Sequence, residues 1–131
     1  MEILFMAHSG IRWLIVFIGA LAFVKFAIGW ARKSQFTKMD RGLLAGFSGS
    51  MDAQVVLGFI FFFWDGLAGG AGFPAYRIEH MTIMLAAAVL GHLPAFMRKV
   101  ENKFAVGLYA VVGALLLVFV GVARLPGGLS R

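Results

Sequence analysis

The chain contains no cysteine among its 131 residues. This absence excludes disulfide bonds, thiolate chemistry, covalently attached c-type haem and cysteine-ligated iron–sulfur clusters. Charged residues are scarce as well, at 14%, whereas apolar residues make up 61%. Soluble domains average about a quarter charged and about half apolar residues. The composition therefore indicates a chain whose surroundings are lipid rather than water.

Four apolar stretches are long enough to cross the hydrocarbon core of a bilayer, which takes about 20 helical residues. They cover about residues 5–31, 42–64, 78–97 and 104–123. The helices of a soluble bundle would each show a charged face, but residues 55–64, 85–90 and 105–122 are apolar all round. We predict an all-α fold, in which the single domain 1–131 forms an antiparallel, up-down four-helix bundle that spans the membrane.

Basic residues give the chain a net charge of +6 and gather in two of its loops. The first loop contains Arg32, Lys33, Lys38 and Arg41, and the third contains Arg98, Lys99 and Lys103. The second loop carries only Arg77. The positive-inside rule places the first and third loops in the cytoplasm, so both termini and the second loop face outward. Nucleic acid is not expected as a partner, because no folded polar face presents the basic residues.

All three histidines lie in or at the edges of the apolar spans, where an ionisable side chain suggests a functional site. His8 and His80 begin the first and third spans, so both are expected near the outer surface. His92 lies about 18 Å deeper, at about 1.5 Å of helix rise per residue. Two bis-histidine haems would need more ligands than the three histidines supply. One haem is feasible, because His8 and His80 can project inward from two helices at one level.

Two further residues extend this candidate haem site. Met84 lies one helical turn below His80 on the same face, and haem iron accepts His/Met as well as His/His ligand pairs. Arg12 lies one turn from His8 and is a candidate partner for a haem propionate, although it points deeper than a propionate would. The alternatives are that both histidines are interfacial residues, and that Arg12 snorkels or pairs with an outer carboxylate. The outer carboxylates are Asp65 and Glu79.

A second polar group is expected in the inner half of the bundle. Asp52, the only carboxylate deep inside a predicted span, and Gln54 belong to the second span. Lys25 approaches from the antiparallel first span, and a Lys–Asp pair would offset the cost of burying either charge. His92 lies at a neighbouring level. Together these four residues form a candidate quinone headgroup site or proton path; the alternative is a polar contact that holds helices together.

Three short motifs run through the chain: His8-Ser9-x-x-Arg12-Trp13, Asp52-x-Gln54-x-x-x-Gly58 and Glu79-His80-x-x-x-Met84, with His92 following. With these motifs the chain resembles small bacterial four-span membrane proteins that are sometimes described as cytochrome-b-like. The resemblance implies a protein of the bacterial inner membrane in which His8 and His80 are the haem ligands, with His92 as a third candidate. The number and spacing of the histidines depart from those of diheme cytochromes b.

Two functions from different classes are compatible with these features. The first is a membrane electron-transfer protein that holds a single b-type haem and has a quinone-related polar site. The second is a cofactor-free accessory subunit of a larger respiratory or photosynthetic membrane complex. No catalytic residues stand out, so a stand-alone enzyme is not the favoured interpretation. The expected partners are the lipid bilayer and other membrane-protein subunits, and a homo-oligomer is compatible with both functions.

Overall fold

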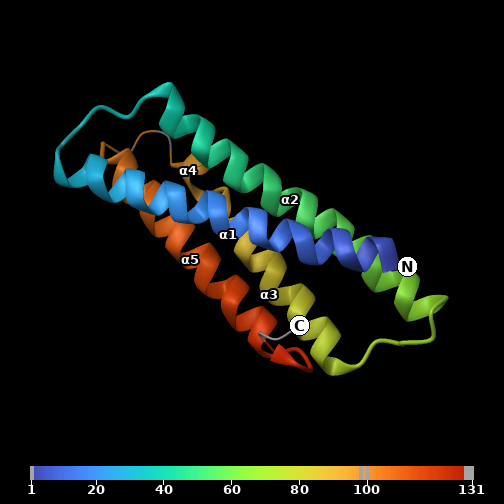
Figure 1. Cartoon of the computed structure of the whole chain (residues 1–131). Coiled ribbons are helices and arrows are strands. Elements are labelled where there is room, and N and C mark those ends of the chain that lie inside the picture. Colours follow the sequence, from blue (N-terminus) through green and yellow to red (C-terminus); the bar gives the residue numbers. More distant parts are fainter. Residues whose placement is uncertain (1, 98, 100, 129–131) are drawn as a thin grey trace.

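The computed structural model describes residues 2–97, 99 and 101–128. It contains five helices: α1 (Glu2–Ala31), α2 (Lys38–Leu67), α3 (Ala75–Gly91), α4 (Leu93–Phe96) and α5 (Lys103–Ala123). No strand occurs in the described residues. Figure 1 shows the four long helices side by side, each running opposite to the next in sequence, with the short α4 toward one end. The predicted all-α fold is confirmed.

Each long helix packs against two others. α1 contacts α2 and α5, and α3 contacts the same two helices. α1 and α3 therefore lie diagonally opposite one another across the bundle. The centre of the bundle is filled by large, fully buried apolar side chains: Ile15, Phe26, Phe47, Met51 and Val111. This arrangement allows residues of α1 and α3 to face each other across the interior.

Three of the helices, α1, α2 and α5, are long and apolar enough to cross a membrane. At about 1.5 Å per residue, the 30 residues of α1 and of α2 extend over about 45 Å. The hydrocarbon core of a bilayer is about 30 Å thick. Large apolar side chains face outward on all four long helices, among them Phe17, Ile60, Val89 and Leu116. Such outward faces are typical of helices that contact lipid.

The third predicted helix, 78–97, differs from the structure. α3 ends at Gly91, and His92 lies at the junction between α3 and the four-residue α4. Pro94 explains the break, because proline lacks the N–H that would bond to the carbonyl of Leu90 and its ring clashes with that carbonyl. His92 is therefore at a helix end and not inside a helix. With 17 residues, α3 is the shortest of the long helices.

The other three predicted helices agree with the structure to within a few residues, although α2 is longer at both ends than 42–64. The start of α2 is fixed by an N-terminal capping arrangement. The backbone N–H and the hydroxyl of Thr37 donate to Oδ2 of Asp40, at 2.8 and 3.0 Å. α5 begins in a related way, because the side-chain oxygen of Asn102 accepts a hydrogen bond from the backbone N–H of Ala105 at 3.1 Å.

The two ends of the bundle differ in charge. Figure 1 shows the α1–α2 loop and α4 toward one end, and the N-terminus and the α2–α3 loop at the other. The first end, which we call the basic end, carries Arg32, Lys33, Lys38, Arg41, Lys99 and Lys103. At the opposite end, arginines are matched by carboxylates in two ion pairs, Arg77 with Asp65 and Arg124 with Glu79. Among the described residues, most of the basic side chains therefore lie at the basic end.

Candidate functional site

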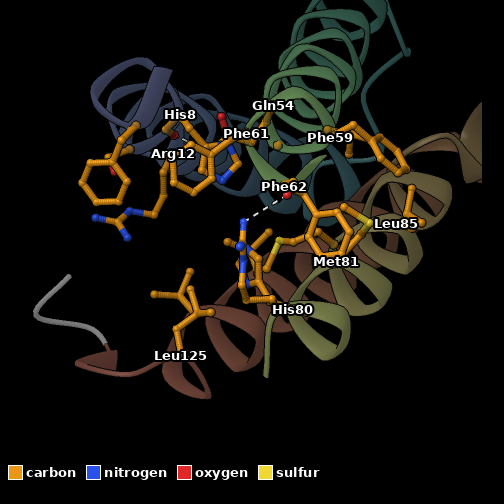
Figure 2. A pocket seen from close by; sticks show the side chains of 18 of the residues that line it. His8, Arg12, Gln54, Phe59, Phe61, Phe62, His80, Met81, Leu85 and Leu125 are labelled. Atoms are coloured by element: carbon orange, nitrogen blue, oxygen red, sulfur yellow. Dashed lines mark hydrogen bonds between the residues drawn. The ribbon is translucent and has the colours of Figure 1, made fainter. Parts of the chain in front are cut away.

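His8 and His80 share a cavity of about 170 Å³ in the half of the bundle away from the basic end. Their imidazole rings lie edge to face, with 6.4 Å between the ring centroids and 74° between the ring planes. His8 comes from α1 and His80 from α3, the diagonal pair of helices. Figure 2 shows the surrounding aromatic and apolar side chains, which include Phe59, Phe61, Phe62, Met81 and Leu85. The two rings lie at one level, as expected from the sequence.

The ring of His80 is oriented by α5. Its Nδ1 lies 2.9 Å from the carbonyl oxygen of Gly121. Because a carbonyl oxygen only accepts, Nδ1 carries the proton, and in the neutral ring the lone pair is on Nε2. A backbone carbonyl in this role is a common way to orient a metal-ligating histidine. A Cβ at Gly121 would meet the flexible end of Met84, and it would lie 3.6 Å from Nδ1 of His80, an ordinary contact distance.

The ring of His8 faces α2. Its Nδ1 is buried and has no hydrogen-bond partner among the described residues, and the same is true of Oε1 of Gln54. The Nε2 of Gln54 donates to the backbone carbonyl of His8 at 2.6 Å. Gly58 lies opposite the ring, where a Cβ would come within 3.1 Å of Cε1 of His8. A buried nitrogen without a protein partner is rare, and a neutral imidazole nitrogen is a good metal ligand.

Two arginines line the same cavity, Arg12 from α1 and Arg77 from α3. The guanidinium of Arg12 lies 5.2 Å from the centroid of the Trp13 ring. Its two suggested carboxylate partners each bind another arginine: Asp65 binds Arg77, and Glu79 binds Arg124. Met84, the alternative ligand predicted from the sequence, also lines the cavity. The structure therefore brings His8, His80, Arg12 and Met84 together around one space.

Arg77 was not singled out by sequence reasoning, which treated it only as a loop charge. Its side chain is 9% exposed, and its guanidinium donates to the carbonyls of Gly72 at 2.9 Å and Phe62 at 3.3 Å. It also lies 3.5 Å from Asp65 and stacks over the rings of Phe61 and Phe62. The spacing Arg77-x-x-His80 was the available signal, because residues three apart share a helix face.

The four residues of the predicted inner site are not assembled as one group. Lys25 donates to Oδ1 of Asp40 at 2.6 Å rather than to Asp52, and Gln54 contacts the backbone of His8. The antiparallel packing of α1 and α2 gives the reason. Since Gln54 lies beside His8, a residue further along α1 must lie beside an earlier residue of α2, and that residue is Asp40.

Only Asp52 and His92 come together from the predicted inner site. Nε2 of His92 lies 2.8 and 2.9 Å from the two carboxylate oxygens of Asp52. The side chain of Asp52 is 52% exposed and that of His92 is 36% exposed, so the pair lies on the side of the bundle. The fully buried carboxylate is Asp40, which the sequence analysis missed. The signal for it was Thr37-x-x-Asp40 at the start of a helix.

The described residues contain no group of three or more histidine, cysteine, aspartate and glutamate side chains that could hold a metal ion. Comparison of the chain with models of protein families, with curated protein sequences and with solved structures gives no match in any of the three. The geometry of the histidine pair is thus the main guide to function.

Proposed function

We propose that this chain is a membrane electron-transfer protein in which His8 and His80 would hold one b-type haem through their ring nitrogens. The observation that carries the proposal is the pair of imidazole rings in one cavity, 6.4 Å apart between centroids. The two rings come from helices on opposite sides of the bundle core, a location that is common for cofactor ligands. With no cysteine in the chain, the haem is held non-covalently.

The donor atoms and the apolar character of the cavity wall suit this group. The buried Nδ1 of His8 has no partner among the described residues, and the bond to Gly121 leaves the lone pair of neutral His80 on Nε2. The wall is mainly apolar and aromatic. Arg12 lines it and is a candidate partner for a propionate, whereas the charge of Arg77 is matched by Asp65. Haem iron with two histidine ligands exchanges single electrons, which is the chemistry the group supplies when bound.

The size of the cavity sets a condition on binding. Its volume of about 170 Å³ is smaller than the about 300–1,000 Å³ of typical ligand pockets, so lining side chains must change rotamer to admit a macrocycle. Met81 and Met84 line the cavity, and their unbranched thioether chains adapt readily. The partly exposed Phe5 also lines it. The chain's own contribution is then to orient His80 through Gly121, to keep water away from the ligands and to place the arginine charges.

The proposal includes a bacterial inner-membrane location with both termini outside. It is supported by the three helices that are long and apolar enough to span, and by the position of both basic loops at one end of the bundle. The positive-inside rule assigns that end to the cytoplasm. The histidine pair then lies in the outer half of the membrane, and Asp52 and His92 lie nearer its middle.

The test is a reduced-minus-oxidised visible spectrum of the chain, purified in detergent after expression with ample haem supply, with haem measured per chain. We expect about one haem per chain in the wild type, near-complete loss in the His8→Ala and His80→Ala variants, and retention in His92→Ala. His92 is the matched control, because it contacts Asp52 outside the cavity.

A wild-type chain without haem would overturn the proposal and favour the alternative, a cofactor-free subunit of a larger membrane complex. Co-purification with other membrane proteins in mild detergent would then identify the complex. Loss of haem in His92→Ala alone would instead show that the ligands are wrongly assigned.

A further inference from the structure

A second cavity, of about 540 Å³, lies toward the basic end of the bundle. It exists because α3 ends at Gly91, well before its neighbours reach the end of the bundle. Figure 1 shows α4 following α3 toward this end, and the cavity is lined by residues of α2, α4 and α5. The residues that line this cavity include Phe36, Arg41, Leu44, Ala45, Lys103 and Val106. We call it the basic-end cavity.

The basic-end cavity carries positive charge from two helices. Arg41 lies in the first turn of α2, and Lys103 is the first residue of α5. The N-terminal end of a helix adds a partial positive charge of its own. No carboxylate is among the described residues that line the cavity. His92 also lines it, and its Nε2 is directed to Asp52.

The carboxylates nearby do not cancel this charge. Asp40 precedes Arg41 in α2, but its carboxylate is bound to Lys25 and Thr37. Glu101 is exposed in the loop before α5. Arg41 and Lys103 therefore face a space whose described lining contains two cationic side chains and otherwise mostly apolar ones.

We propose that the basic-end cavity binds the phosphate headgroup of an anionic phospholipid through Arg41 and Lys103. Its volume lies within the about 300–1,000 Å³ of ligand pockets. Basic pockets between membrane helices on the cytoplasmic side are suited to anionic headgroups. The apolar part of the wall, which includes Phe36, Leu44 and Val106, suits the glycerol and upper acyl portion of a lipid, and a free phosphate ion would gain nothing from it.

The depth of the basic-end cavity in the bilayer matches the depth of a phospholipid headgroup. α2 is about 15 Å longer than the hydrocarbon core is thick, at about 1.5 Å per residue. Its first turn, which contains Arg41, therefore reaches the headgroup region of a bilayer. The inference rests on the membrane setting of the proposed function, and it is independent of haem at the histidine pair.

The experiment measures binding of phosphatidylglycerol to the full chain in detergent, by native mass spectrometry and by the rise in unfolding temperature. We expect the wild type to retain phosphatidylglycerol in preference to phosphatidylcholine. In the double variant Arg41→Gln/Lys103→Gln we expect the affinity to fall roughly 30-fold, since each basic residue near an anionic lipid contributes about a fivefold gain in affinity. The charge-preserving variant Arg41→Lys/Lys103→Arg keeps most of the affinity.

The matched control is Arg32→Gln/Lys38→Gln, which removes the same charge from the same end but from exposed residues outside the lining. It retains the wild-type affinity. Equal losses in both double variants would overturn the proposal in favour of diffuse surface charge. Equal binding of phosphatidylcholine, or displacement of the lipid by an equal concentration of inorganic phosphate, would also overturn it.

A variant that adds bulk without changing charge guards against a folding defect in the double variant. Ala45 is exposed and lines the cavity. The larger side chain in Ala45→Phe would occupy part of the cavity, and we expect this variant to lose phosphatidylglycerol binding. Full retention by Ala45→Phe would contradict occupation of the cavity. Haem content is measured in parallel. A haem-free chain that still binds phosphatidylglycerol selectively would contradict the proposed haem function but support the lipid site.

Discussion

The Nζ of Lys25 in α1 lies 2.6 Å from Oδ1 of Asp40 in α2, and the side chain of Asp40 is fully buried. The same carboxylate accepts two hydrogen bonds from Thr37 through its other oxygen. One residue therefore caps α2 and ties it to α1. Together with the bond from Gln54 to the backbone of His8, this contact fixes how far the two helices are shifted along one another.

Loss of the lysine should destabilise the fold. Lys25→Met removes the charge that faces Asp40, and we expect the free energy of unfolding to fall by about 1.5–3 kcal/mol, the range for hydrogen bonds to charged groups. Denaturant unfolding in detergent measures the effect, with the exposed Lys38→Met as the control, expected to change it by about 0.5 kcal/mol or less. In a double-mutant cycle with Asp40→Asn the two effects should not add. Additive effects would show that the interaction between Lys25 and Asp40 contributes no free energy to the fold.

The glycine opposite His8 should be necessary for haem binding. A Cβ added at Gly58 would lie 3.1 Å from Cε1 of His8. The larger side chain in Gly58→Val therefore forces the ring to move. We expect haem per chain to fall about 10-fold or more, as happens when groups that orient metal ligands are replaced. Gly49→Val is the control on the same helix, because a Cβ at Gly49 meets nothing within 4 Å. Equal haem content in the two variants would argue against His8 as a ligand.

Packing at the basic end should be sensitive to one methyl group. A Cβ at Gly29 would lie within 3.0 Å of three atoms of the Phe104 ring, and this ring is confined by Phe26 and Phe36. We expect Gly29→Ala to lower the free energy of unfolding by about 1–3 kcal/mol. In contrast, Gly10→Ala, where a Cβ meets nothing within 4 Å, should raise it by about 0.5–1 kcal/mol through helix propensity. Unfolding in detergent tests both; a destabilised Gly10→Ala would show that propensity is not the deciding factor.

The absence of cysteine makes the membrane orientation directly testable. Ser34 lies in the α1–α2 loop and Ala71 in the α2–α3 loop, and both are exposed. A membrane-impermeant maleimide added to spheroplasts should label the Ala71→Cys variant, whereas Ser34→Cys should react only after the membrane is permeabilised. The reverse pattern would invert the orientation. Labelling of both variants in intact spheroplasts would contradict a membrane-spanning bundle.

Much of the fold could be predicted from hydropathy and loop charge, because each depends on a local stretch of chain. The boundaries of three helices agree within a few residues, and the common level of His8 and His80 followed from their places at the starts of two spans. The end of α3 at Gly91 was also readable, since Pro94 removes a helix hydrogen bond. A prediction that weighed only apolar length extended that helix too far.

The partners of the polar residues could not be predicted in the same way. Pairing Lys25 with Asp52 assumed a depth for each residue, but depth depends on the shift between antiparallel helices, and a few residues of shift change every partner. The orientation of His80 by the carbonyl of Gly121 is a further case, because a backbone acceptor has no sequence signature.

The sequence by itself determined that this chain forms apolar helices, that most of its basic residues gather in two of its loops, and that three histidines are its main candidates for chemistry. These properties follow from residue type and spacing, which act over a few turns of one helix. Only the tertiary structure decided that His8 and His80 meet across the diagonal of the bundle while His92 turns to Asp52. It also decided that the early end of α3 leaves a second, cation-lined cavity. Both outcomes depend on how whole helices pack and end relative to one another, and that is set by the summed side-chain contacts of all four long helices.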